Sequence, residues 1–114
     1  MKLHVGCGTK CLDGWTNLDI MDRPNVDIVS SAHELPQLKD DSVDEILAEH
    51  LLEHFTFYEA QRALSEWFRV LKSGGKLTIE VPDLLSLCKA FVDANGDLQD
   101  LALKGEVKIL TLEA

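Results

Sequence analysis

Two glycines and an aspartate near the N-terminus form the pattern that points most clearly to ligand binding. Gly6 and Gly8 directly follow a short apolar run at residues 3–5, and Asp19 ends the next apolar run. Because glycine lacks a Cβ atom, the backbone can turn sharply there and a flat ligand can press against it. An apolar strand, a tight Gly-x-Gly turn and a later carboxylate are typical of the nucleotide-type corner of an open α/β sheet.

A second group that could do chemistry is the pair His50 and His54, with Glu53 between them. An imidazole that titrates near neutral pH suits proton removal from an acceptor, so His50 is a candidate general base. The alternative is a packed histidine where a strand meets a helix. The same residues match the His-x-x-Glu-His pattern of zinc hydrolases, in which one helical face carries two histidine ligands. That pattern needs a long helix and a third ligand, so a zinc hydrolase is the minor alternative.

The three cysteines, Cys7, Cys11 and Cys88, are an odd number in a chain without an export signal. We therefore expect reduced thiols rather than a disulfide framework. Cys7 and Cys11 lie four residues apart, but they lack the second pair that a structural zinc site needs. We expect no metal site there.

Length and charge narrow the possible functions. The 114 residues, 46% of them hydrophobic, are enough for the core of one domain over residues 1–114 but few for an α/β enzyme. A formal net charge of −9 without a Lys/Arg cluster argues against nucleic acid as a partner. The sequence has no apolar run long enough to span a membrane and no secretory signal, so we expect no membrane partner and a cytoplasmic location.

The rest of the chain alternates between strand and helix patterns. We expect strands at residues 3–5, 15–20, 26–29, 43–48, 76–81 and 107–112. The segment 30–41 is polar and contains Pro36, so we expect a loop with at most one helical turn. A similar polar loop is expected between Gly8 and Gly14.

The strongest helix signal begins at Thr56, because Thr56 and Glu59 form a capping-box pattern. The apolar positions that follow recur on one helical face, namely Ala60, Ala63, Leu64, Trp67, Phe68 and Leu71. We expect Trp67 and Phe68 in the core and the Gly74-Gly75 pair to end the helix. Two further helices are expected at residues 84–91 and 97–103.

Short strands interleaved with helices predict a mostly parallel α/β sheet with helices on both faces. In such sheets, ligands bind at the carboxyl ends of the strands, where the strand order reverses. Those ends are polar or glycine positions: Gly6-Cys7-Gly8, Asp19, Ser30-Ser31, Glu49-His50 and Pro82-Asp83. Their expected convergence on one edge predicts a binding site.

Ordered motifs run along residues 2–83, namely Leu3-His4-Val5-Gly6-Cys7-Gly8, Asn17-Leu18-Asp19, Leu35-Pro36, Asp40-Asp41-Ser42-Val43-Asp44-Glu45-Ile46, Leu52-Glu53-His54 and Arg69-Val70-Leu71-Lys72-Ser73-Gly74-Gly75-Lys76-Leu77. This series resembles class I S-adenosylmethionine-dependent methyltransferases of the small-molecule type. Motifs in a family's order are far more specific than any one motif alone. The resemblance implies a Rossmann-like sheet of seven strands, S-adenosylmethionine as cofactor, and transfer of its sulfonium methyl group to a nucleophile.

The resemblance also implies cofactor-binding residues at the strand ends, namely Gly6, Cys7, Gly8, Asp19, Ser31, Ala32, Leu35 and Glu49. The backbone of the Gly-x-Gly turn would line the methionine part of the cofactor. Asp19 would accept hydrogen bonds from the two ribose hydroxyls. Ser31 and Ala32 would lie beside the adenine, with Leu35 nearby. Glu49 and His50 would lie near the methionine end and the transferred methyl group.

The chain departs from the family pattern in several places. His4 stands where the family usually has an acidic residue, and Lys10 where a third glycine is common. Only ten residues separate Gly8 from Asp19, about half the roughly 20 of a dinucleotide fold, so we expect a loop in place of the first helix. After the fifth strand only residues 107–112 remain to extend the sheet. We therefore expect a shortened sheet, in a truncated copy or in a homodimer that completes the open edge.

The sequence thus predicts a methyltransferase whose acceptor is a small molecule or a sugar-type hydroxyl or amine. The alternative from another class is a non-catalytic binding or interaction module that keeps the sheet but has lost the acceptor pocket. The complete cofactor edge favours the enzyme, and the missing terminal strands favour the module.

Overall fold

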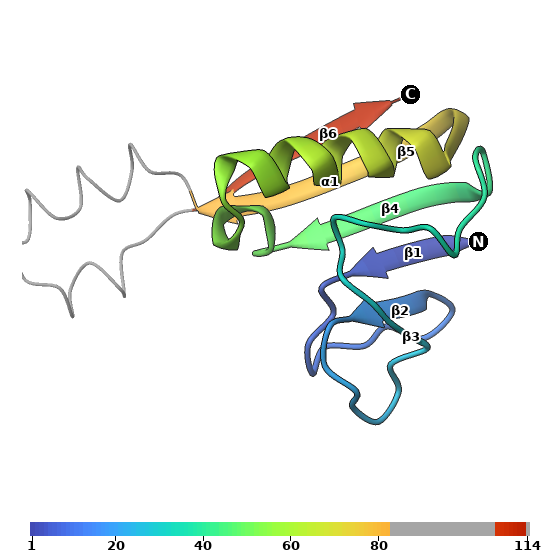
Figure 1. The fold of residues 1–114 in the computed structure, drawn as a ribbon, viewed down its shortest axis with the longest axis vertical. Coiled ribbons are helices and arrows are strands. Elements are labelled where there is room, and N and C mark those ends of the chain that lie inside the picture. The colour runs from blue at the N-terminus through green and yellow to red at the C-terminus, as the bar shows by residue number, and fades with distance from the viewer. Residues whose placement is uncertain (83–106, 114) are drawn as a thin grey trace, which may run out of the picture.

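The part of the chain that the structure describes forms an open six-stranded sheet with a helix packed on one face (Figure 1). A computed structural model describes residues 1–82 and 107–113. The strands are β1 (Lys2–Val5), β2 (Thr16–Asp19), β3 (Ile28–Val29), β4 (Val43–Glu49), β5 (Leu71–Pro82) and β6 (Val107–Glu113). Their order is β3-β2-β1-β4-β5-β6, with the first five parallel and β6 antiparallel to β5.

Within residues 1–82 and 107–113, this architecture confirms the Rossmann-like, mostly parallel sheet, with fewer strands than the seven that the resemblance implies. The strand order reverses at β1, which pairs with β2 on one side and β4 on the other. The carboxyl ends of β1, β2, β4 and β5 therefore point to the same edge (Figure 1). In the described residues α1 (Phe57–Val70) covers one face. The helices expected at residues 84–91 and 97–103 lie outside the described part. Among residues 1–82 and 107–113, no helix combines the length and apolarity needed to cross a bilayer.

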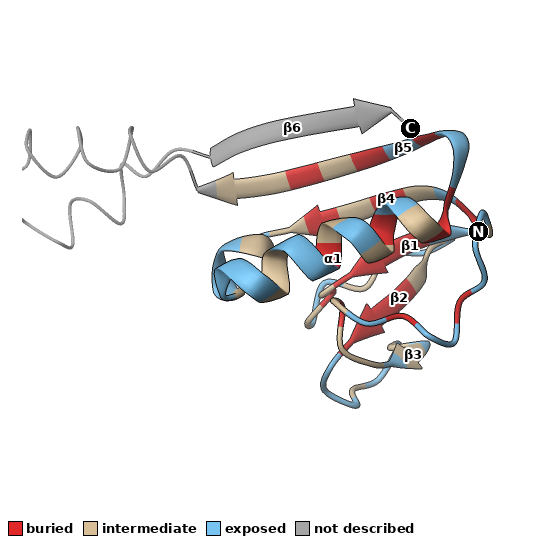
Figure 2. Ribbon diagram, turned by 45° about the horizontal axis from the view of Figure 1, so that its top comes forward, coloured by how far each residue is buried: buried red, intermediate tan, exposed pale blue. Residues whose placement is uncertain are grey.

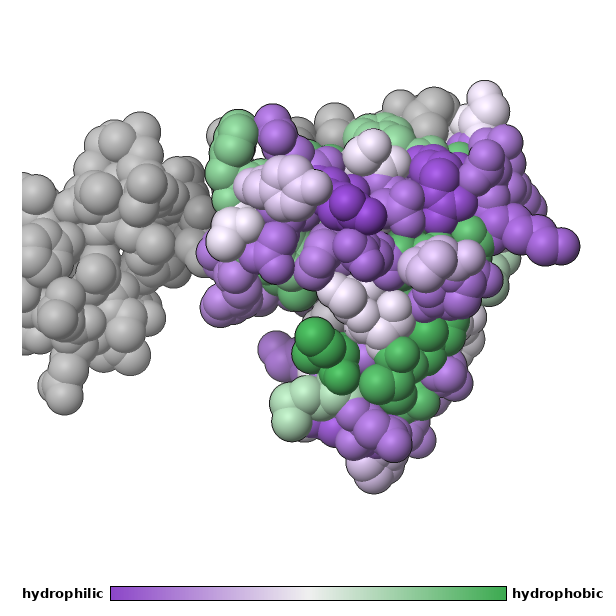
Figure 3. Space-filling model, viewed as in Figure 1, coloured by the Kyte–Doolittle hydropathy of each residue, from purple (hydrophilic) through white to green (hydrophobic). Residues whose placement is uncertain are grey.

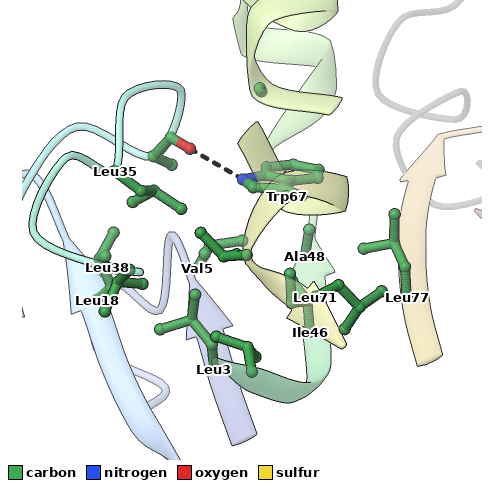
Figure 4. Packing of buried hydrophobic residues seen from close by; sticks show 14 of the residues in the cluster. Leu3, Val5, Leu18, Leu35, Leu38, Ile46, Ala48, Trp67, Leu71 and Leu77 are labelled. Carbon is green, nitrogen blue, oxygen red and sulfur yellow. Dashed lines mark hydrogen bonds between the residues drawn. The ribbon is translucent and has the colours of Figure 1, made fainter. Parts of the chain in front are cut away.

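The hydrophobic core lies on the face of the sheet that α1 covers (Figures 2 and 4). It comprises Leu3, Val5, Leu18, Ala32, Leu35, Leu38, Val43, Ile46, Ala48, Ala63, Trp67, Val70, Leu71, Leu77 and Ile79. Trp67 is fully buried, and its indole N–H donates to the Ala32 carbonyl at 2.9 Å. Because Ala32 belongs to the segment between β3 and β4, this segment packs on the same face as α1.

Helix α1 begins as predicted. Thr56 accepts from the Glu59 N–H at 3.1 Å, and the Glu59 carboxylate accepts from the Thr56 N–H at 3.0 Å, which completes the capping box. The buried stripe of the helix is Ala63, Trp67 and Val70. Phe68 is 43% exposed, so the expectation that it lies in the core is wrong. It lies about 100° around the helix from Trp67, outside the stripe that the sheet can cover.

The end of α1 also differs from the prediction. The sequence pattern continues through Leu71 to the Gly74-Gly75 pair, whereas the helix ends at Val70. The N–H groups of Asp41 and Ser42 donate to the last two helical carbonyls at 3.1 and 2.8 Å, so the loop before β4 ends the helix. Strand β5 starts at once, and the glycine pair lies within it, where its register against β4 shifts.

Arg69 ties the end of α1 to the loop before β4. Its guanidinium donates to Glu66 at 2.8 Å, to Asp40 at 2.7 Å and to the carbonyls of Leu35 and Leu38 at 2.8 and 3.0 Å. The hydrogen bond from Arg69 lowers the pKa of Glu66, whose carboxylate also accepts the Leu35 N–H at 2.8 Å. Asp40, expected as a solvated loop residue, is thus part of an ion-pair network.

A loop replaces the first helix, as predicted, because the backbone between β1 and β2 contains turns and no helix. The Asn17 amide holds this loop, accepting from the Leu12 N–H at 2.9 Å and donating to the Leu12 carbonyl at 3.1 Å. Trp15 packs edge-on against His4 with 6.5 Å between ring centroids, and the Lys2 ammonium lies 5.5 Å from its ring. Trp15 therefore covers part of the sheet face that a helix would otherwise cover.

Candidate functional site

The polar strand ends predicted from the sequence meet at one edge of the sheet. The turn after β1, the end of β2 and the end of β4 contribute to two neighbouring cavities. Gly6 lines both of them. This arrangement is the one expected where the strand order of an open parallel sheet reverses.

The Gly6–Gly8 turn depends on glycine for two separate reasons. Gly6 and Gly8 have φ angles of +65° and +55°, in the left-handed region that side chains disfavour. A Cβ atom on Gly6 would also lie only 2.9 Å from the methyl groups of Leu51. The Cys7 N–H donates to the Leu18 carbonyl at 3.1 Å, which fixes the turn against β2.

Asp19 is a nearly buried carboxylate whose side chain is 12% exposed. Its Oδ2 atom accepts from the Met21 N–H and from the Arg23 guanidinium, both at 3.2 Å. Among the described residues no hydrogen bond reaches its Oδ1 atom, so this oxygen can accept from a ligand. Arg23 was not identified from the sequence, because a spacing of four residues indicates an ion pair only within a helix, and residues 19–23 are not helical.

The first cavity, which we call the Asp19 cavity, has a volume of about 250 Å³. It is lined by Gly6, Leu18, Asp19, Ile20, Ser31, Ala32, His33, Leu51, His54, Phe55 and Glu59. The predicted residues Ser31 and Ala32 are thus brought beside Asp19. Leu35 is not, because it is fully buried in the core and lies outside both cavities. Part of the rim is apolar, since Ile20 is 71% exposed, and an apolar patch bordered by hydrophilic residues lies over the β2 and β3 region (Figure 3).

The second cavity, which we call the His50 cavity, has a volume of about 270 Å³. It is lined by His4, Gly6, Cys7, Gly8, Thr9, Lys10, Glu49 and His50. His50 has a φ angle of +50°, and its N–H donates to the Glu80 carbonyl at 2.7 Å. Its ring nitrogens lie 3.3 Å from the Glu80 carboxylate and 4.0 Å from that of Glu53. Glu80 was missed because the sequence places it inside the fifth strand, not at its end.

His4 forms the buried wall of the His50 cavity. Its side chain is 2% exposed, its Nε2 atom lies 3.8 Å from the Glu49 carboxylate, and its Nδ1 atom has no hydrogen-bond partner among the described residues. Burial lowers the pKa of His4, and Asn17 and Glu49 oppose this shift. His4 is therefore a neutral imidazole where the family usually has a carboxylate.

The lowered pKa of His4 predicts a pH-dependent stability. The unfolded chain takes up a proton near pH 6.5, whereas the folded chain resists protonation until a lower pH. The free energy of unfolding should therefore fall as the pH drops from 7.5 through 6.5, and urea midpoints across this range measure the fall. His4→Gln should flatten it, and His54→Gln, at a side chain that is 73% exposed, should leave it unchanged. Equal slopes for wild type and His4→Gln would contradict this explanation.

The zinc-hydrolase alternative loses its structural basis. It requires His50 and His54 on one face of a helix, but His50 lies outside any helix and only a short 3₁₀ helix spans Leu52–His54. Glu53 lies between the two rings, 4.0 Å from His50 and 3.7 Å from His54. Within residues 1–82 and 107–113, no three His, Cys, Asp or Glu side chains gather as a metal-binding group.

Known structures share this fold. The PH0226 protein of Pyrococcus horikoshii OT3 matches with a TM-score of 0.67 and 22% identity, covering 81% of this chain and 53% of its own length. A SAM-dependent methyltransferase of Archaeoglobus fulgidus matches with a TM-score of 0.65 and 25% identity, and the match covers 82% of this chain and 51% of that protein. The 1,6-didemethyltoxoflavin-N1-methyltransferase of Burkholderia thailandensis was solved with 1,6-didemethyltoxoflavin and S-adenosylhomocysteine. It matches with a TM-score of 0.63 and 18% identity, and the match covers 72% of this chain and 44% of that enzyme. The chain thus spans about half the length of the first two.

Sequence comparison supplies the family. A comparison with curated protein sequences gives no significant match. A family model described as a methyltransferase domain, however, matches residues 3–79, well over half of the chain. This range includes the Gly6–Gly8 turn, Asp19 and both cavities. The match agrees with the strand order and the position of the cavities, and the chain belongs to the methyltransferase domain family.

Proposed function

We propose that this chain binds S-adenosylmethionine at the carboxyl edge of its sheet and transfers the methyl group to a small-molecule acceptor. The observation that carries the proposal is the meeting of the Asp19 cavity and the His50 cavity at Gly6. Each cavity alone is smaller than the roughly 300–1,000 Å³ of typical ligand pockets. An extended ligand that lies across the Gly6 backbone would use both.

The residues present fit this cofactor. Asp19 has an oxygen available for the ribose hydroxyls, and a short carboxylate can accept both. Ser31 and Ala32 line the Asp19 cavity beside the exposed Ile20 side chain, which suits an adenine ring. In the His50 cavity, the backbone after Gly6 would follow the methionine part, and the Glu49 carboxylate would attract its ammonium group.

His50 would act as the general base for a hydroxyl or amine acceptor. Bound S-adenosylmethionine supplies the electrophilic sulfonium methyl group. The Glu80 carboxylate, 3.3 Å from Nε2, would orient the ring and leave Nδ1, which is 4.0 Å from Glu53, to take the proton of the acceptor. Confinement in the cavity would supply the alignment on which much of the rate depends. The net charge of −9 and the small-molecule ligand of the Burkholderia enzyme both favour a small or sugar-type acceptor over nucleic acid.

Binding and turnover test this proposal separately. S-adenosylhomocysteine is titrated into the protein by calorimetry, and methyl transfer from labelled S-adenosylmethionine is then screened with pools of small hydroxyl and amine compounds. We expect micromolar binding and transfer to at least one pool. The His50→Gln variant should lower kcat while the Kd of S-adenosylhomocysteine stays close to wild type. A folded protein that binds no S-adenosylhomocysteine would overturn the cofactor site.

Gly6→Ala should weaken S-adenosylhomocysteine binding by roughly tenfold or more, which corresponds to about 1.4 kcal/mol. The new methyl group would push the end of the Leu51 side chain into the Asp19 cavity. The stability cost should be about 1–2 kcal/mol, because an alanine is strained at a φ of +65°. Calorimetry measures the first effect and urea denaturation the second.

Gly14→Ala is the matched control for this prediction. Gly14 has a φ of +81°, but no atom lies within 4 Å of the position of its Cβ. The Gly14→Ala variant should therefore lose a similar free energy of unfolding but bind S-adenosylhomocysteine as tightly as wild type. The Gly6→Ala/Leu51→Ala double variant should regain part of the affinity. If Gly6→Ala binds like Gly14→Ala, the Gly6 turn does not contact the ligand.

The second candidate function is a non-catalytic binding module over residues 1–114. Binding of S-adenosylhomocysteine without transfer to any acceptor pool would support it. A homodimer that completes the sheet at a free edge stays a prediction, which the molar mass from light scattering tests on the same sample.

A further inference from the structure

Cys7 and Cys11 bring two thiols into contact at the turn after β1. Their Sγ atoms lie 3.4 Å apart, and both thiols face the Gly8 carbonyl, at 3.7 and 3.8 Å. The Lys10 N–H donates to the Cys7 carbonyl at 2.9 Å, which closes a turn and brings Cys11 back over Cys7. Both cysteines are free, and the proposed methyl transfer uses neither thiol.

The two thiols differ in access. Cys7 is 4% exposed at the His50 cavity. Cys11 is partly exposed and lines a separate open cavity of about 270 Å³ beside Asn17 and Asp27. Burial and the neighbouring Cys11 raise the pKa of Cys7 to about 12, so the Cys7 sulfur carries its proton at neutral pH. A small oxidant from solvent therefore reaches Cys11 first.

We propose that Cys7 and Cys11 are a redox-active dithiol that closes to a disulfide across Gly8 by exchange with a small-molecule disulfide of the glutathione type. The Cys11 thiolate, after losing its proton to solvent, attacks one sulfur of the small disulfide, and one small thiolate leaves and takes up a proton. The Cys7 sulfur then loses its proton to solvent, attacks the Cys11 sulfur and releases the second small thiolate. The two protein thiols are oxidised, and the small disulfide is reduced to two thiols.

The geometry favours this bridge in the folded protein. The sulfur atoms must move from 3.4 Å to the roughly 2.05 Å of a disulfide, within the single turn of residues 7–11. Only a small shift is needed, so the Gly6–Gly8 turn keeps its conformation. Because the native turn already holds the thiols together, the bridge should form more readily in the folded than in the unfolded chain. The inference does not depend on methyl transfer.

The test uses the full chain with Cys88→Ser, which leaves only Cys7 and Cys11 as thiols. The protein is equilibrated with mixtures of reduced and oxidised glutathione, native and in concentrated urea, then quenched with acid and weighed by mass spectrometry. We expect an internal disulfide, lighter by two hydrogens, whose equilibrium constant of formation is at least tenfold larger in the native protein. The thermal midpoint of the oxidised protein should exceed that of the reduced protein. Adding a reductant should lower it to the value of the reduced protein again.

Single replacements in the same background identify the order of attack. Cys7→Ser should leave Cys11 carrying one glutathione, and Cys11→Ser should leave Cys7 largely unmodified. Equal equilibrium constants in native and denatured protein, glutathione on both cysteines, or disulfide-linked dimers as the main product would overturn the proposal. Since mass is the readout, a failure to bind S-adenosylhomocysteine would not affect this result.

Discussion

Replacing Asp19 with alanine is expected to weaken S-adenosylhomocysteine binding by roughly 5- to 150-fold, or about 1–3 kcal/mol, the typical cost of losing a charged hydrogen-bond partner. The side chain is only 12% exposed at the end of β2, so little solvent competes for its oxygens. Its Oδ2 atom already accepts from the Met21 N–H and from Arg23, whereas no hydrogen bond from the described residues reaches Oδ1, so Oδ1 is available to a ligand. The ribose hydroxyls would lose this acceptor, and isothermal titration calorimetry measures the change in Kd.

Asp22→Ala is the matched control for Asp19. Asp22 is an exposed carboxylate three residues along the chain, outside both cavities, and its replacement should change the Kd by less than about twofold. Asp19→Asn keeps an acceptor oxygen and should retain part of the affinity. Since Asp19→Ala also breaks the pair with Arg23, a thermal melt must show that the variant is folded. An unchanged Kd in a folded Asp19→Ala variant would remove the ribose role.

The backbone part of the site could be predicted from sequence because it follows from strand ends. Gly6, Gly8 and Asp19 each follow or end an apolar run, and parallel strands bring such ends to one edge whatever the loops do. The structure brings them together around the two cavities, with Glu49 at the end of β4 and His50 directly after it.

The side-chain partners of the site could not be predicted in the same way. Arg23 reaches Asp19 only because the turn after β2 folds back, and Glu80 meets His50 because β5 extends beside β4 to its last residues. Leu35 illustrates the same limit, since the resemblance implies a place near the adenine, whereas its side chain belongs to the buried core. Such contacts depend on the path of a loop or on the register between two strands, and hydrophobic periodicity and composition determine neither.

In the fold, too, features set by neighbouring residues could be predicted, and features set by contacts between distant segments could not. The capping box of α1 involves residues three apart, and its sequence pattern was sufficient to predict it. The end of α1 was predicted at Gly74-Gly75 because glycines commonly end helices. The loop before β4 instead supplies the N–H groups that satisfy the last carbonyls, an interaction between distant segments. Tertiary hydrogen bonds thus overrode a local signal.

Trp67→Ala is expected to lower the free energy of unfolding by about 3–5 kcal/mol, the usual cost of removing a buried tryptophan. Trp67 is fully buried between α1 and the sheet, and its indole N–H donates to the Ala32 carbonyl at 2.9 Å. A loss of this size is a large fraction of the roughly 5–15 kcal/mol that stabilises a typical domain. Urea denaturation followed by circular dichroism measures it.

Trp67→Phe separates the packing of this residue from its hydrogen bond. The ring would still fill most of the core, but the Ala32 carbonyl would lose its donor, at a cost of about 1–3 kcal/mol. Because Ala32 lines the Asp19 cavity, the folded Trp67→Phe protein should also bind S-adenosylhomocysteine more weakly. Phe68→Ala is the matched control, since Phe68 is 43% exposed and its loss should cost less than roughly 1 kcal/mol. If Phe68→Ala destabilises the protein as much as Trp67→Ala, the buried stripe of α1 is wider than its contacts with the sheet indicate.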